Sequence, residues 1–192
     1  MMKVNEIFYS LQGEGYHAGT AAVFVRLSGC NLRCPFCDTQ HESGTEMSEA
    51  EIVEVLKQWP TRFVVLTGGE PLLQITEKFL YELRHYFVAV ETNGTQPLIE
   101  GLDWITLSPK DEWLGERARP VLDWTDELKV LYDGANDPSR YDYIRAECRS
   151  LQPIDTGNMK LNAIIRQKAV DYCLQHPEWS LSLQIHKILK IR

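Results

Sequence analysis

The sequence predicts an α/β fold: a partial, open (β/α) barrel of about six parallel strands, in a single domain over residues 1–192. Two observations support this prediction. Short, continuous apolar runs recur along the chain, as expected of parallel strands that are covered on both faces. Helical patterns separate these runs, which indicates right-handed βαβ connections. About six strands are too few for the eight of a closed barrel, and no linker is long enough to divide the chain.

The strands are expected at residues 22–27, 63–66, 87–90, 104–107 and 127–132, with a weaker one at 150–153 and a last one at 180–184. Polar loops follow the first four of them. In α/β folds the carboxyl ends of the strands form the ligand-binding edge, so we expect these loops to face one cavity.

The connecting segments have helical patterns. Ser48 and Glu51 form a capping box at a helix start, and apolar residues continue to Trp59, before Pro60. Two more helices are marked by Phe79, Leu80 and Leu83, and by Leu161, Ile164, Ile165, Ala169 and Tyr172.

The composition restricts the function. Apolar residues make up 44% and charged residues 24%, as in ordinary soluble globular proteins. We find no apolar run long enough for a membrane span and no signal peptide, so a cytoplasmic location is expected. A net charge of −7 argues against a general nucleic-acid binder. A small anionic substrate is still compatible, because a local Arg or Lys can bind it.

The cysteines indicate a metal centre. Cys30, Cys34 and Cys37 lie within eight residues. Cys148 and Cys173 stand alone, and we expect them to be small buried hydrophobic residues. Thiolates suit zinc or an iron–sulfur cluster, and a structural zinc site needs four ligands, for which His41 is the candidate fourth. Three ligands on a [4Fe–4S] cluster leave one iron open for a substrate or cofactor. This open iron favours the cluster over zinc.

The Cys-x3-Cys-x2-Cys spacing, with the aromatic Phe36 before the last Cys, resembles the signature of the radical S-adenosylmethionine (SAM) superfamily. Gly68-Gly69-Glu70-Pro71 resembles the loop that binds the SAM amino group in that superfamily. A Gly-Gly-Glu turn alone is a weak signal, but its place after the second predicted strand strengthens it. The resemblance implies a radical SAM type of partial barrel.

Further motifs resemble the 7-carboxy-7-deazaguanine synthase family. They are residues 8–15, Gly19, Arg26, residues 37–39, 91–95, 108–110, 151–155 and 184–187, in order along nearly the whole chain. That family converts 6-carboxy-5,6,7,8-tetrahydropterin to 7-carboxy-7-deazaguanine with loss of ammonia, on the route to queuosine and related 7-deazapurines. The resemblance implies SAM, a [4Fe–4S] cluster and Mg²⁺ as cofactors, a homodimer, and flavodoxin or a similar protein as reductant.

The resemblance also implies residue roles. The cluster ligands are Cys30, Cys34 and Cys37, and the magnesium ligand is Thr39. The SAM contacts are Phe36, Asp38, Gly68, Gly69, Glu70, Gly94, Ser108, Pro109, Lys110, Gln152, Pro153, Ile154 and Asp155. The substrate contacts are Leu11, Gln12, Gly13, Glu14, Arg26, Thr92 and the terminal carboxylate of Arg192, with Glu14 suited to the guanidine-like edge of the pterin.

Simpler interpretations stay open at this point. Thr39 suits a helix N-cap, Arg26 a surface ion pair and residues 12–15 a plain turn. Arg192 also departs from the small or apolar last residue expected in the family, and the loop after Cys37 is short. Two alternative functions remain: an activase of glycyl-radical enzymes, and an iron–sulfur or zinc-binding module without catalysis.

Overall fold

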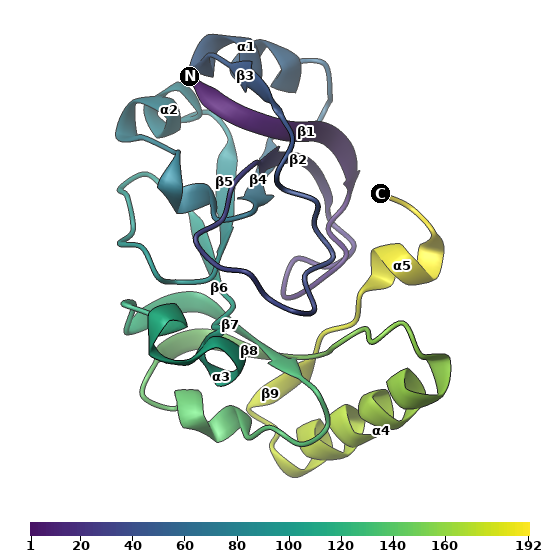
Figure 1. The fold of residues 1–192 in the computed structure, drawn as a ribbon. Coiled ribbons are helices and arrows are strands. Elements are labelled where there is room, and N and C mark those ends of the chain that lie inside the picture. The colour runs from purple at the N-terminus through teal and green to yellow at the C-terminus, as the bar shows by residue number, and fades with distance from the viewer.

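The computed structural model describes residues 1–192, and its strands form one sheet in the order β3-β1-β2-β4-β5-β6-β7-β8-β9 (Figure 1). The strands are β1 (Met2–Leu11), β2 (Ala21–Leu27), β3 (Thr45–Met47), β4 (Phe63–Gly68), β5 (Phe87–Thr92), β6 (Trp104–Leu107), β7 (Trp124–Tyr132), β8 (Arg145–Pro153) and β9 (Trp179–Leu181). The helices are α1 (Glu49–Leu56), α2 (Glu77–Glu82), α3 (Asp111–Leu114), α4 (Met159–Gln175) and α5 (Ile185–Leu189), with 3₁₀ turns η1 (Pro71–Leu73), η2 (Gly115–Ala118) and η3 (Pro138–Tyr141).

The parallel part of the sheet confirms the predicted fold class. β2, β4, β5, β6, β7, β8 and β9 are parallel neighbours, which gives seven strands where about six were predicted. β1 and β3 were not predicted. β1 pairs antiparallel with β2, and β3 pairs antiparallel with β1 at the edge of the sheet. β1 is mixed apolar and polar and β3 has three residues, so neither has the continuous apolar run of a doubly covered strand.

Several predicted boundaries change. β8 starts five residues early, at Arg145, and β9 ends at Leu181, so the predicted strand end at Gln184 is wrong. Gln184 instead precedes α5, a helix that was not predicted. The capping box of α1 is confirmed: the Ser48 hydroxyl accepts from Glu51 N at 3.3 Å, and Ser48 N donates to the Glu51 carboxylate at 2.7 Å. α1 ends at Leu56, so Trp59 lies beyond it.

Two apolar cores cover the outer face of the sheet. Val25, Leu66 and Val90 belong to one, which lies under α1 and α2, and the other packs beneath α4 (Figure 1). On α4 the buried residues are Ile165 and Ala169, whereas Leu161 and Ile164, which also marked the predicted helix, are exposed. Burying a Val or Leu side chain contributes about 1.5–3 kcal/mol, so these cores dominate the stability.

The inner face of the sheet is apolar toward one end of the strands and polar toward the other. Because alternate residues face opposite sides of a strand, Phe24 and Arg26 of β2 both face inward, as do Ala89 and Glu91 of β5. Near the amino ends the interior is apolar and includes stacked Phe8 and Phe24, with ring centroids 4.9 Å apart. Near the carboxyl ends it is polar and charged. The fold therefore prepares a polar cavity at one end of the barrel.

A seam crosses the sheet between β6 and β7. Only Thr106–Glu127 and Leu107–Leu128 are paired there. Side chains complete the ladder at Ile105, whose N–H donates to the Asp126 carboxylate at 2.7 Å and whose carbonyl accepts from the Thr125 hydroxyl at 2.7 Å. The two halves of the sheet are thus joined partly by side chains. No helix in the structure combines the length and apolarity needed to cross a bilayer.

Candidate functional site

A cavity of about 940 Å³ opens at the carboxyl ends of the parallel strands. Most of the predicted site residues line it: Leu11, Gln12, Gly13, Glu14, Arg26, Cys30, Cys34, Phe36, Cys37, Asp38, Thr39, Gly68, Gly69, Thr92, Ser108, Lys110, Gln152, Pro153, Ile154, Asp155 and Arg192. They come from the loops after β2, β4, β5, β6 and β8, the segment after β1, and the end of the chain. The strand-end loops thus meet at one site, as predicted.

Three residues predicted to contact SAM, Glu70, Gly94 and Pro109, lie outside the lining of this cavity. Glu70 is fully buried. Its carboxylate accepts hydrogen bonds from Leu72 N at 3.1 Å, the Thr92 hydroxyl at 2.8 Å and Asn93 N at 2.8 Å. Burial raises the pKa of Glu70, and these three donors oppose the rise. In this structure Glu70 fastens the loop after β4 to the end of β5.

The cysteine loop begins directly after β2. Leu32 N donates to Cys30 Sγ at 3.4 Å, which turns the loop around that thiol. Asn31 donates to the Thr95 hydroxyl at 2.7 Å and accepts from Asn93 Nδ2 at 3.2 Å, so the loop is fastened to the end of β5. Figure 1 shows this segment crossing the open end of the barrel before it reaches β3.

Gly68 lets the β4 turn approach this loop. It has φ +128°, and a Cβ at this position would lie 2.0 Å from the Leu27 carbonyl oxygen. Gly69 N donates to that oxygen at 3.0 Å. The glycines therefore have a packing role that the sequence pattern alone did not indicate.

The three thiols of the cysteine loop, Cys30, Cys34 and Cys37, all line the cavity, and so does His41. No group of three His, Cys, Asp or Glu side chains lies close enough together in this structure to hold a single metal ion. Burial raises the pKa of Cys30 and Cys34, and the charge of Lys110 opposes the rise at both. Separate thiolates on one loop suit a cluster, in which each binds a different iron.

Residues 12–20 form a strap that closes the open side of the barrel between β1 and β9. The strap is closed at its base, where Gln12 N donates to Thr20 O at 2.8 Å. Gly15 N donates to the Ser182 hydroxyl of the β9 side at 2.8 Å, and Tyr16 N donates to Glu127 of β7 at 3.0 Å. Residues 12–15 are therefore more than a plain turn, because they are tied to the segment after β9 and residues 12–14 line the cavity.

A buried ion network lies where the strap meets β5 and β7. Lys129 Nζ lies 2.7 Å from Glu14 Oε2 and 3.5 Å from Glu91 Oε1. Gln12 Nε2 donates to Glu91 Oε1 at 3.1 Å, and Gln184 Nε2 donates to Glu14 Oε1 at 2.9 Å. Lys129 and Glu91 were not predicted as site residues. The signal was available, because Glu127 and Lys129 place two charges on one face of an otherwise apolar strand.

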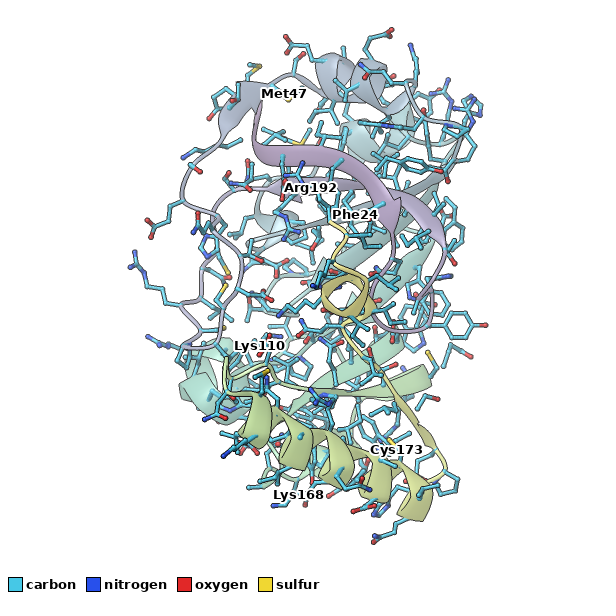
Figure 2. The ribbon with its side chains drawn as sticks, turned by 90° about the vertical axis from the view of Figure 1, so that its right-hand side faces the viewer. Phe24, Met47, Lys110, Lys168, Cys173 and Arg192 are labelled. Carbon is cyan, nitrogen blue, oxygen red and sulfur yellow. The ribbon has the colours of Figure 1, made fainter.

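A second charged group lies where β1, β2 and the cysteine loop meet. Arg26 donates to the Thr39 hydroxyl at 3.2 Å and pairs with Glu6 at 2.9 Å. Thr39 precedes no helix, so its interpretation as an N-cap is wrong. The guanidinium groups of Arg26 and Arg192 lie 5.7 and 5.3 Å from the Phe8 ring centroid. Figure 2 shows Arg192 near Phe24, below the purple β1 ribbon.

Two lysines organise the predicted SAM contacts. Lys187 lies 2.9 Å from Asp38 and 3.2 Å from Asp155, so it joins the cysteine loop to the loop after β8. Lys110 donates to the Ser108 carbonyl and hydroxyl at 2.5 and 2.6 Å. Burial lowers the pKa of Lys110 to about 8.

Comparisons with known proteins agree with this geometry. Residues 24–111 match the model of the Radical SAM superfamily. The chain is 48% identical to a 7-carboxy-7-deazaguanine synthase of Bacteroides thetaiotaomicron and 42% identical to one of Bradyrhizobium diazoefficiens, covering 100% and 98% of both chains, respectively. It also superposes on the crystal structure of QueE from Escherichia coli with a TM-score of 0.71 and 25% identity, over 96% of this chain and 94% of the other. The chain belongs to the 7-carboxy-7-deazaguanine synthase family of the radical SAM superfamily.

Proposed function

We propose that this chain is a carbon–nitrogen lyase that converts 6-carboxy-5,6,7,8-tetrahydropterin to 7-carboxy-7-deazaguanine in 7-deazapurine and queuosine biosynthesis. The product differs from the substrate by one ammonia, so the ring contraction needs no net oxidant or reductant. The observation that carries the proposal is the single cavity that unites the three cysteines, the Arg26–Thr39 pair, and Gln12 and Glu14 of the strap.

The cysteines and the surrounding loops would hold the cofactors. Cys30, Cys34 and Cys37 would bind a [4Fe–4S] cluster, and the loops around Asp38, Ser108 and Asp155 would bind SAM beside it. When bound, this pair supplies a 5′-deoxyadenosyl radical through one-electron cleavage of SAM. The role of the protein is to exclude water and to hold the substrate in one orientation, because a primary radical abstracts any hydrogen atom within reach.

The two charged groups of the cavity would orient the substrate. Arg26 and Thr39 converge, so a substrate carboxylate would meet the guanidinium there, and Mg²⁺ would bind the Thr39 hydroxyl together with substrate oxygens and waters. Glu14 and Gln12 would accept from the N–H donors of the opposite, guanidine-like edge. A hydrogen atom at C6 of the pterin would then be fixed relative to SAM.

The test is an anaerobic assay of the reconstituted protein with tetrahydropterin, SAM, Mg²⁺ and a reductant. We expect 7-carboxy-7-deazaguanine and ammonia in equal amounts, in excess of the SAM supplied, and deuterium transfer from C6-labelled substrate into recovered SAM. Absence of product, together with radical formation on an added glycyl-radical enzyme, would overturn the proposal in favour of an activase.

Membership of the family supports two further expectations: a homodimer, and a one-electron reductant such as flavodoxin. Light scattering on the purified protein measures the first, and product formation with flavodoxin in place of a chemical reductant measures the second.

A further inference from the structure

We infer that Lys129 is a positioning residue for the substrate, a buried ammonium that holds the Glu14 and Glu91 carboxylates in place around the Gln12 amide. This inference rests on the proposed function and extends it. It adds a residue that contacts neither the cysteine loop nor the Arg26–Thr39 pair in this structure, but determines how the opposite edge of the cavity is presented.

Lys129 connects three separate elements of the barrel. Its side chain is 6% exposed and projects from β7, whereas Glu14 belongs to the strap and Glu91 to β5. The Gln12 amide lies between the two acids and is fixed from both ends. Its Nε2 donates to Glu91 at 3.1 Å, and its Oε1 accepts from Glu14 N at 3.1 Å. Loss of the ammonium would remove the cation that both acids share, and would leave Glu14 held by Gln184 and Glu91 held by Gln12 and Thr67.

The charge balance explains why a cation is needed at this position. Charged groups face Lys129 from the strap (Glu14), from β5 (Glu91), from its own strand (Glu127) and from the loop after β6 (Lys110). Two partly buried carboxylates without a cation repel each other, which favours uptake of a proton by one of them. Burial alone would raise the pKa of Glu14, but the charge and hydrogen bond of Lys129 outweigh it and hold the pKa at about 2.

The protonation state matters for recognition. An ionised carboxylate only accepts hydrogen bonds, whereas a protonated one also donates. The amine and amide N–H groups of a pterin edge are donors, so they need an acceptor-only partner, and a buried mismatch weakens binding. By keeping Glu14 ionised and Gln12 oriented, Lys129 would select the donor edge of the substrate.

The experiment compares the anaerobic holoenzyme with Lys129→Met, Glu14→Gln, the double variant Lys129→Met/Glu14→Gln, and Lys168→Met as the matched control. Lys168 lies on the outer helix α4, away from the cavity (Figure 2), and donates to the Gly134 carbonyl at 2.9 Å. Steady-state kinetics from pH 5 to pH 9 are combined with direct binding of 6-carboxypterin, followed by its fluorescence, and with iron content.

In Lys129→Met we expect wild-type iron content and a KM raised about tenfold, equivalent to about 1.4 kcal/mol of binding. The acid limb of kcat/KM should move to higher pH, because Glu14 then titrates near or above the ordinary range of a carboxyl group. The double variant should keep the raised KM but lose this limb, since no Glu14 carboxyl is left to titrate. Lys168→Met should match the wild type in every respect.

A Lys129→Met enzyme with wild-type KM, pterin binding and pH profile would overturn the inference. So would a loss of activity that follows thermal stability with no change in the pH profile, because that result would make Lys129 purely structural. If Lys129→Met does not fold, the double variant takes its place, and a wild-type KM in the double variant would also overturn the inference. A wild-type enzyme that neither binds nor converts the pterin would instead refute the proposed function.

Discussion

Gly69 packs directly against the backbone of Gly29: a Cβ at position 69 would lie 1.9 Å from the Gly29 carbonyl oxygen. The next peptide strengthens this contact, because Glu70 N donates to the same oxygen at 2.9 Å. The turn after β4 and the start of the cysteine loop are therefore built as one unit. Glycine at position 69 is required by this close approach.

Gly69→Ala should destabilise the protein by about 3 kcal/mol, because backbone atoms cannot move aside as a flexible side chain can. It should also lower the iron content, since Cys30 follows Gly29 directly. Denaturant unfolding and iron analysis measure the two effects. Gly115→Ala is the control: it faces open space at φ +68° and ψ −162°, so it should cost about 1–3 kcal/mol of backbone strain but keep full iron content. Full iron and wild-type stability in Gly69→Ala would contradict the packing argument.

Replacing Cys30, Cys34 or Cys37 by Ala should abolish the broad visible absorption of a cluster and nearly all activity. Cys148→Ala and Cys173→Ala should keep both. Burial raises the pKa of Cys148 to about 12, so it stays a neutral thiol at pH 7. Cys173 lies on α4, remote from the cavity (Figure 2). Four iron and four sulfide retained per chain in any of the first three variants would disprove its assignment as a ligand.

Thr39→Ala should leave iron content and SAM binding unchanged but remove the stimulation of activity by Mg²⁺. The reason is the loss of the one hydroxyl that lies beside Arg26 at the expected carboxylate position. Thr39→Ser retains that oxygen and serves as the matched control. Initial rates across a magnesium titration measure the effect, and an Ala variant that responds to Mg²⁺ like the wild type would rule out the assignment.

Stability should depend on acid pH through Glu14, whose pKa falls from 4.5 to about 2 on folding. A depressed pKa in the folded state stabilises above the unfolded value, so this contribution is complete above about pH 5 and is lost as pH falls towards 2. Its size at pH 7 is about 3 kcal/mol, shared with Lys129 rather than added to it. Urea unfolding at pH 7 and pH 3 should show a smaller difference for Glu14→Gln than for the wild type. The exposed Glu100→Gln should keep the wild-type difference.

The sequence pattern predicted the parallel strands because doubly covered strands need continuous apolar runs, as in Phe63–Gly68. The same criterion misses β1, which mixes apolar and polar residues and contributes Asn5, Glu6 and Phe8 to the cavity lining. A helical apolar pattern likewise does not show how wide a stripe of α4 the sheet covers. Ile165 is buried there, whereas Ile164, one residue before it, is exposed.

The site was predicted mainly through the resemblance, and its missing parts are informative. Motif matching found Glu14 but not the lysine that pairs with it, since Lys129 is 115 residues away and belongs to an apolar strand. It also did not indicate that the Glu70 carboxylate is buried and binds backbone and hydroxyl groups of its own chain. Pairings across a barrel depend on strand order and register, which no local pattern encodes.

The seam between β6 and β7 has an energetic consequence. The cysteine loop and the Gly68–Gly69 turn come from the half of the sheet before the seam, whereas Lys129 and Gln152 come from the half after it. A ligand that contacts both sides acts as a non-covalent cross-link between two apolar cores. Because only the native arrangement presents both sides together, each bound ligand adds its own binding free energy to folding, about 2.7 kcal/mol at a concentration one hundred times its Kd. Bound cofactor and substrate would thus stabilise the fold of this barrel as well as take part in its chemistry.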